Sequence, residues 1–174
     1  MAAPNNSQKM SSRSFANGNT TLFPMPQDQL TSDDYYTPPE FFNDLGLQFD
    51  IDVAAPIGGC DWIPANKYFD QLTDGLTSDW YGSVFMNPPF SQTVLWIKKF
   101  TEHGCGVAIV PVTRAHWFNQ LWKDPNISFA IPEQDKTLFR FIHKGKRVGV
   151  FMPVIIIAIG NINCEALSKV GFVR

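Results

Sequence analysis

The 174-residue sequence lacks the cysteine pattern of a disulfide-rich or zinc-binding protein. Its three cysteines, Cys60, Cys105 and Cys164, are widely spaced and form no Cys-x-x-Cys pair. An odd number of separated cysteines argues against a disulfide framework and against a structural zinc site. The three histidines are scattered, and the acidic residues show no metal-ligand spacing, so we expect no metal site.

Long apolar runs and a signal-like N-terminus are also missing. The longest apolar stretch, residues 148–159, is about half the ~20 residues that a membrane helix needs, and Gly149 and Pro153 interrupt it. No basic segment followed by an apolar one stands at the N-terminus, which argues against export. We therefore expect a protein of the cytoplasm that makes no membrane contact.

Composition and local sequence predict one globular domain. The chain is 44% hydrophobic and 14% aromatic, which is typical of a protein with a packed core. Residues 1–32 are rich in Ser, Asn, Gln and Thr without periodicity, so we interpret them as a flexible tail. Residues 33–174 are long enough for a single domain. The oligomeric state is not evident from the sequence.

The net charge of −2 conceals a strong asymmetry between the two halves of the chain. Residues 1–90 contain three basic and eleven acidic side chains, whereas residues 91–174 contain eleven basic and five acidic ones. An acidic half suits a cationic small ligand such as a sulfonium, and a basic half suits phosphates. The alternative is that solvated surface charges cluster without a functional reason.

Apolar periodicity predicts helices that alternate with strands. Thr37 can cap a helix that ends before Gly46, and Ser91 can cap another that runs to about His103 with Val94, Leu95, Ile97 and Phe100 inward. A further helix is expected over residues 114–122, and residues 66–79 are interpreted as irregular. Strands are expected over residues 47–53, 83–86, 106–112, 127–131, 137–143 and 148–159.

This alternation indicates a three-layer α/β fold with a mixed sheet. The last two strands are joined by a turn at Lys144-Gly145-Lys146, so they form a C-terminal β-hairpin. Ligands of open α/β sheets bind beyond the carboxyl ends of the strands. Residues 52–55, 87–90 and 111–114 fall at such ends and are the first candidates for a functional site.

The tetrapeptide Asn87-Pro88-Pro89-Phe90 fits a particular chemistry. The amine of adenine or cytosine is a poor nucleophile because its lone pair is delocalised into the ring. The Asn87 side-chain oxygen and the Pro88 carbonyl can accept its hydrogens, and the lone pair is then free to attack a methyl group. Prolines stiffen this backbone, and Phe90 offers a flat face for a flipped base. The alternative is an ordinary turn after a strand, because Asn and Pro are common turn residues.

Several basic residues of the second half are candidates for nucleic-acid contact. Arg114 follows a predicted strand end, where it can meet a phosphate or form a surface ion pair. Lys144, Lys146 and Arg147 form a basic hairpin tip that suits phosphates or a groove, although such a cluster can also be merely solvated.

With these residues in view, the sequence resembles the phage-type DNA N6-adenine methyltransferases, relatives of Dam that use S-adenosylmethionine. Asn87-Pro88-Pro89-Phe90 matches the catalytic Asn-Pro-Pro-aromatic motif of that family. Four further segments match in order between about residues 35 and 120: Tyr36-Thr37-Pro38-Pro39-Glu40, Phe49-Asp50-Ile51-Asp52-Val53-Ala54-Ala55, Asp74-Gly75-Leu76 with Trp80, and Val110-Pro111-Val112-Thr113-Arg114 with Trp117-Phe118.

The resemblance implies a Rossmann-like, S-adenosylmethionine-dependent methyltransferase fold and site-specific methylation of adenine N6 in double-stranded DNA. Asn87, Pro88, Pro89 and Phe90 are the implied catalytic residues. The implied cofactor residues are Tyr36, Thr37, Pro38, Asp52, Ala54 and Asp74. Among them, Asp52 would hold the amino group of the methionine moiety, Asp74 would accept a hydrogen bond from the cofactor's adenine amine, and Tyr36 and Thr37 would contact its two ends.

The sequence departs from the family pattern in three respects, one of which is that the ribose-binding acid usual after a second strand cannot be placed. Phe90 stands where Tyr is commoner, and no Gly-x-Gly loop follows the first strand, so Asp52-Val53-Ala54-Ala55 would fill that role. Two classes of alternative stay open: methylation of another planar amine (cytosine N4, an RNA base or a protein glutamine), and a non-catalytic nucleic-acid-binding module. The resemblance also implies a phage or prophage protein that acts in the cytoplasm of a bacterial host.

Overall fold

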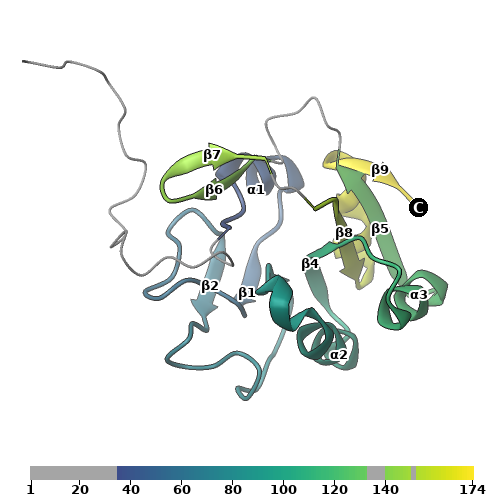
Figure 1. Ribbon diagram of the computed structural model, residues 1–174, viewed down its shortest axis with the longest axis horizontal. Helices are drawn as coiled ribbons and strands as arrows, with labels where there is room; N and C mark the ends of the chain where they lie inside the picture. The colour runs from purple at the N-terminus through teal and green to yellow at the C-terminus, as the bar shows by residue number, and fades with distance from the viewer. Residues whose placement is uncertain (1–34, 133–139, 150–151) are drawn as a thin grey trace, which may run out of the picture.

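The computed structural model describes residues 35–132, 140–149 and 152–174, and it shows a mixed α/β protein (Figure 1). The expected tail, residues 1–32, lies outside the described residues, as does the first part of the strand expected over 137–143. Short helical and extended elements alternate along the chain. The helices are α1 (Pro39–Leu45), α2 (Thr93–His103), α3 (His116–Lys123) and α4 (Asn161–Ala166), with 3-10 turns η2 (Phe90–Gln92) and η4 (Leu167–Lys169).

The main sheet has seven strands in the order β2-β1-β3-β4-β8-β5-β9. The strands are β1 (Phe49–Asp52), β2 (Ala65–Tyr68), β3 (Val84–Met86), β4 (Gly106–Pro111), β5 (Ile127–Pro132), β8 (Val154–Ile159) and β9 (Gly171–Val173). The first four in this order run parallel, whereas β8 is antiparallel to both of its neighbours and β9 is antiparallel to β5. The predicted mixed sheet is confirmed.

Apolar side chains on the two faces of the sheet pack against two separate layers of helices. On β4, Val107 and Ile109 belong to a core cluster with α1, α4 and η4, whereas Ala108 and Val110 belong to a cluster with α2 and α3. This period of two follows from the pleat of a strand, whose successive side chains point to opposite faces. The sheet therefore lies between two layers of helices, as the sequence predicts (Figure 1).

The expected C-terminal hairpin is wrong in its pairing. The turn lies at Lys144 and Gly145, whose positive φ values of 50° and 69° suit a type I′ hairpin. It joins only β6 (Phe141–His143) to β7 (Lys146–Val148), which form a two-stranded sheet of their own. The apolar run after it is a separate strand, β8, inserted between β4 and β5, because a strand buried on both faces belongs at the centre of a sheet. Three elements follow β8, namely α4, η4 and β9, and none of them is expected from the sequence.

Three local expectations also differ from the structure. In α2 the buried face consists of Thr93, Trp96, Ile97 and Phe100, whereas Val94 and Leu95 are exposed. The N-caps of α1 and α2 are Pro38 and Gln92, neither with a side-chain cap hydrogen bond, so neither Thr37 nor Ser91 is the cap residue. Strand β2 lies in a segment expected to be irregular, because it is an exposed edge strand without an apolar face.

Candidate active site at the carboxyl ends of β1 and β3

The candidate site forms where two neighbouring parallel strands end. In the register of β1 and β3, Asp52 lies opposite Phe85, and Asn87 follows the last residue of β3. Parallel strands end at the same edge of a sheet, so Asp52 and Asn87 border one cleft of about 370 Å³. This volume lies within the ~300–1,000 Å³ of small-molecule sites. The ends of these two strands therefore lie together at one cleft, as expected for an open α/β sheet.

The cleft is lined by residues from the segment before α1, from the strand ends and from the start of α2. The predicted site residues among them are Tyr36, Thr37, Asp52, Ala54, Asn87 and Pro89. The residues that sequence reasoning did not assign to it are Tyr35, Pro56, Ile63, Gln71, Phe85, Ser91, Gln92 and Trp96. Segments separated by about fifty residues therefore meet around one cavity.

The side chain of Asn87 is held in place by a hydrogen bond to the segment before α1. Its side-chain Nδ2 donates to the backbone carbonyl of Tyr35 at 2.7 Å. An amide carries two donor hydrogens on nitrogen and an acceptor on oxygen, so a partner for the nitrogen sets the direction of the oxygen. The half-buried Asn87 thus keeps Oδ1 as the acceptor that a ligand amine requires.

Asp52 is a buried carboxyl group at the floor of the cleft. It is 3% exposed, and its Oδ1 accepts a hydrogen bond from the backbone N–H of Ala54 at 3.2 Å. Burial raises the pKa of Asp52 to about 7, because desolvation disfavours the charged form more than that one hydrogen bond favours it. A cation placed beside the carboxylate would compensate for this desolvation.

Two polar atoms at the cleft have no hydrogen-bond partner among the described residues. One is Oγ1 of Thr37, whose side chain is 1% exposed, and the other is Nε1 of Trp96, whose side chain is 6% exposed. Buried polar groups are normally paired, because an unpaired one costs roughly 1–3 kcal/mol. Since both residues line the cleft, a bound polar molecule is the natural source of the missing partners.

Other predicted site residues lie close to the cleft without lining it. Pro38 and Pro88 are buried, and Phe90 opens η2 with its half-buried ring packed against the core cluster that contains α1. The Phe90 carbonyl accepts a hydrogen bond from Oγ1 of Thr93 at 2.9 Å, which fixes the turn between β3 and α2. The tetrapeptide therefore presents Asn87 and Pro89 to the cleft and anchors itself through its other two residues.

Asp74 is exposed and lies outside the residues that line the cleft. Its Oδ1 accepts from the backbone N–H of Leu76 at 3.0 Å, and its φ is +46°, so the side chain stabilises its own turn. Trp62, Phe69 and Trp80 also serve the framework: Phe69 is a core residue, and the indoles of Trp62 and Trp80 donate to the carbonyls of Thr37 and Gly75.

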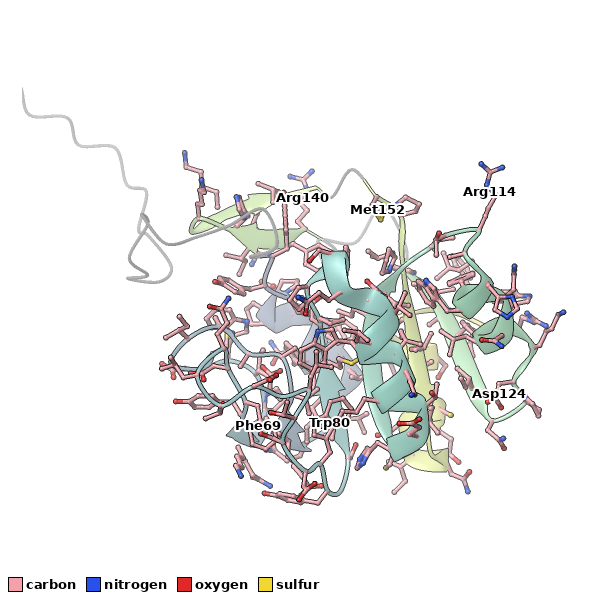
Figure 2. All side chains as sticks on the ribbon, turned by 60° about the horizontal axis from the view of Figure 1, so that its bottom comes forward. Phe69, Trp80, Arg114, Asp124, Arg140 and Met152 are labelled. Atoms are coloured by element: carbon pink, nitrogen blue, oxygen red, sulfur yellow. The ribbon has the colours of Figure 1, made fainter. Side chains whose placement is uncertain are left out.

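The predicted nucleic-acid residues are exposed but differ in their partners. Lys144 lies in the turn of the β6–β7 hairpin, Lys146 begins β7, and Arg114 follows the carboxyl end of β4. Figure 2 shows Arg114 extending away from the body of the protein, at the same end as Arg140, an exposed residue that the sequence analysis did not single out. Arg147 instead forms an ion pair with Glu40 of α1, which lowers the pKa of Glu40.

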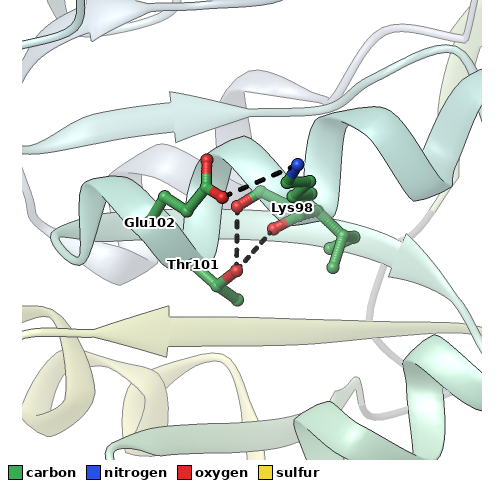
Figure 3. A network of polar contacts seen from close by, with 4 residues as sticks. Lys98, Thr101 and Glu102 are labelled. Carbon is green, nitrogen blue, oxygen red and sulfur yellow. Dashed lines mark hydrogen bonds and ion pairs between the residues drawn. The ribbon is translucent and has the colours of Figure 1, made fainter.

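Two further cations of the basic half are also engaged within the protein. Lys98 pairs with Glu102 on the exposed face of α2 at 3.9 Å, next to Thr101, whose hydroxyl bonds to helix carbonyls (Figure 3). Lys99 donates to the carbonyls of Gly75 and Leu76 at 3.0 and 2.8 Å. The positive charge available to phosphates is therefore smaller than the sequence count indicates.

Among the described residues, no group of three or more His, Cys, Asp or Glu side chains is arranged to hold a metal ion. Within the same described ranges, no helix has the length and apolar character to cross a membrane.

Comparison with known proteins gives one match. A family model described as DNA N-6-adenine-methyltransferase (Dam) matches residues 27–136, which include Thr37, Asp52, Asn87 and Arg114 but not the β6–β7 hairpin. No curated protein and no solved structure matches the chain. Because the match covers more than half of the sequence and the whole lining of the cleft, the chain belongs to the Dam family of DNA N6-adenine methyltransferases, enzymes that methylate adenine in DNA.

Proposed function

We propose that the enzyme binds S-adenosylmethionine in the cleft at the ends of β1 and β3 and methylates N6 of an adenine flipped out of double-stranded DNA at a defined sequence. In this proposal the three-layer arrangement of helices and sheet is a Rossmann-like methyltransferase fold. The observation that carries it is the cleft itself, where Asn87 lies beside Thr37 and Trp96, each with a buried polar atom lacking a partner among the described residues. Family membership supports use of this cofactor in general.

The residues present suit such a cofactor. The buried carboxyl of Asp52 suits the cofactor's cationic amino group, and the indole N–H of Trp96, which has no partner among the described residues, suits a hydroxyl or ring acceptor. The Thr37 hydroxyl can donate or accept, while Tyr36 and Ala54 supply the adjoining wall. When bound, the cofactor supplies an electrophilic methyl group that carries its own leaving group.

The chain's own contribution is to activate and hold the base. Asn87 Oδ1 and the Pro88 carbonyl accept hydrogen bonds from the adenine amine, which makes its nitrogen lone pair available for attack. These acceptors are positioned before the substrate arrives, because the Asn87 amide nitrogen is already bonded to Tyr35 and two prolines stiffen the adjoining backbone. Such preorganised dipoles act mainly in the transition state. Phe90 supports the flipped base from its position at the start of η2.

On the DNA side, the exposed Arg114, Lys144 and Lys146 neutralise phosphates, and Arg140, which lies at the same end of the protein as Arg114 in Figure 2, joins them. Arg147 fixes the hairpin to α1 through Glu40. Methylation of cytosine N4, an RNA base or a protein glutamine, and a purely DNA-binding role, are not favoured by the family match.

Calorimetric titration with S-adenosylmethionine tests the assignment of the cleft. Thr37→Val and Asp52→Asn should each weaken binding, because one removes the unpaired hydroxyl and the other the buried charge. Thr101→Val and Asp124→Asn are matched controls away from the cleft and should bind as the wild type does. Equal affinity in all four variants would place the cofactor elsewhere.

A second experiment tests the reaction product. DNA incubated with labelled cofactor is digested to nucleosides and separated. Label in N6-methyladenine supports the proposal, whereas label in N4-methylcytosine would change the substrate while leaving the amine-activation chemistry intact. Wild-type cofactor binding without label in DNA would favour a non-catalytic DNA-binding role.

A further inference from the structure

We propose that Tyr35 is a positioning residue for Asn87 and that the β6–β7 hairpin holds it in place. This inference rests on the proposed function, because it concerns the direction of the acceptor that Asn87 offers to the base. Tyr35 lies outside the segments that resemble the family motifs, and its role comes from three contacts that surround it.

The first contact joins Tyr35 to Asn87. The Tyr35 carbonyl accepts the 2.7 Å hydrogen bond from Asn87 Nδ2, and both residues line the cleft. A change in the position of this carbonyl would let the amide rotate about its last side-chain bond, a torsion with a broad energy profile. The oxygen acceptor would then leave the direction of the adenine amine.

The second and third contacts join Tyr35 to the hairpin. The Tyr35 ring stacks on the ring of His143 with centroids 4.6 Å apart and planes 17° apart, and it meets Phe141 edge-on at 6.4 Å. The next residue, Tyr36, exchanges two backbone hydrogen bonds with Ile142, both of 2.8 Å. The residue after the key carbonyl is thus joined to β6 by an isolated antiparallel β-bridge.

The hairpin itself is firmly attached to the body of the protein. Phe141 and Ile142 are each 1% exposed, and Arg147 pairs with Glu40 of α1. The exposed Lys144 lies in its turn, and the exposed Lys146 begins β7. The order of contacts therefore runs from an exposed basic turn, through β6, to Tyr35 and then to the amide of Asn87.

The test uses substitutions that break the ring stack without changing the backbone. Tyr35→Leu and His143→Ala should lower kcat by about 10- to 100-fold, the scale expected when a reacting group is misplaced by roughly an ångström. The KM for S-adenosylmethionine should change little. Tyr35→Phe and His143→Phe keep a stacked ring and should restore most of kcat. Tyr81→Leu, which removes an exposed tyrosine in another loop, is the matched control and should behave as the wild type.

A spectroscopic measurement separates positioning from a general loss of structure. The side-chain amide protons of Asn87, assigned by comparison with Asn87→Ala, should shift in Tyr35→Leu and return in Tyr35→Phe, while the remaining amide spectrum stays that of a folded protein. Circular dichroism and thermal unfolding of each variant identify any that fail to fold. For His143→Ala, the same amide signals report on the second contact.

The outcomes distinguish this inference from the proposed function. If Asn87→Ala is inactive while Tyr35→Leu and His143→Ala keep wild-type kcat and unchanged Asn87 signals, the positioning role is wrong and the role of Asn87 stands. If Asn87→Ala itself retains wild-type activity, the proposed function fails and the inference fails with it. An equal loss of kcat in Tyr35→Leu and Tyr35→Phe would also overturn it, since the ring stack would then not be the cause.

Discussion

Trp80 and Trp96 stack on each other with ring centroids 6.3 Å apart, yet among the described residues only the indole nitrogen of Trp80 has a hydrogen-bond partner. Trp80 Nε1 donates to the carbonyl of Gly75 at 2.7 Å, whereas Trp96 Nε1 has no partner among the described residues. Two neighbouring tryptophans therefore differ in what their N–H groups do: one stabilises a loop, and the other is available at the cleft.

Trp96→Phe should weaken cofactor binding, and it should also cost some stability because Trp96 packs in the core. Loss of one net hydrogen bond is worth roughly 0.5–1.5 kcal/mol, so the dissociation constant for S-adenosylmethionine should rise about two- to twelvefold. Trp80→Phe should lower stability with little effect on affinity. Calorimetry and denaturant unfolding measure the two effects, and unchanged cofactor affinity in Trp96→Phe would assign its indole to packing alone.

Asp52 should make both stability and cofactor affinity depend on pH. Because its pKa is raised from 3.8 to about 7 in the folded protein, the contribution of this group to stability is fully present below pH 3.8 and is lost as the pH rises to about 7. Asp52→Asn should therefore become more stable than the wild type over this interval, with a constant difference above it. Urea unfolding at pH 5 and pH 8 measures this, and parallel stability curves would contradict it.

The same group should affect the cofactor in the opposite direction. Wild-type affinity for the cationic S-adenosylmethionine should rise as the pH passes through about 7, where the free protein's carboxyl ionises. Asp52→Asn should bind more weakly and lose this dependence. Titrations at pH 6 and pH 8 in both proteins provide the comparison, and an identical pH dependence in the variant would exclude Asp52 as its source.

Substitutions of Asn87 should separate chemistry from binding. Asn87→Ala removes the acceptor and should lower kcat by about 10²- to 10³-fold while cofactor affinity persists. Asn87→Asp should retain more activity than Ala because it still offers an acceptor, but less than the wild type because a carboxylate oxygen would face the Tyr35 carbonyl. Single-turnover methylation measures the order of rates, with Asn119→Ala on the exposed face of α3 as control. Activity of Asn87→Ala equal to the wild type would refute the role.

The basic residues should be distinguished by the salt dependence of DNA binding. Lys144→Ala, Lys146→Ala and Arg114→Ala should each lower affinity for all DNA sequences and reduce the salt slope by about 0.9 per lost phosphate contact. Arg147→Ala should affect stability more than the slope, because its guanidinium pairs with Glu40. Lys123→Ala, at the far end of α3, is the control. Equal slopes in Lys123→Ala and Lys146→Ala would mean that the hairpin tip makes no phosphate contact.

The parts of the fold that sequence reasoning captured are those with a strong local pattern. Buried strands such as Val84–Met86 and Gly106–Pro111 are short apolar runs bounded by turn residues, and they set the position of Asn87. Strand β2 could not be recognised, since Ala-Asn-Lys-Tyr at a sheet edge has no buried face to give a pattern. The pairing of β8 with β4 and β5 is likewise a long-range choice that no local signal specifies.

The site residues divide in the same way, into those that a local pattern reveals and those that depend on contacts distant in the sequence. Asn87, Asp52 and Thr37 were identified through a motif, and the structure brings all three to one cleft. Trp96 is not among the residues that the sequence places on the inward face of its helix, and its nitrogen, which has no partner among the described residues, is visible only when its surroundings are known. Tyr35 was missed because its contribution is a backbone carbonyl, a group that every residue has.

The parallel pairing of β1 and β3 fixes how far apart the two sides of the cleft lie. Neighbouring strands repeat about every 4.8 Å, and the cofactor side and the base side of the cleft belong to strands that are direct neighbours. Under the proposed roles, the main-chain hydrogen bonds between these two strands fix the distance between the cofactor side and the base side of the cleft. Loops around the cleft can then vary to suit different DNA sequences while that path keeps its length.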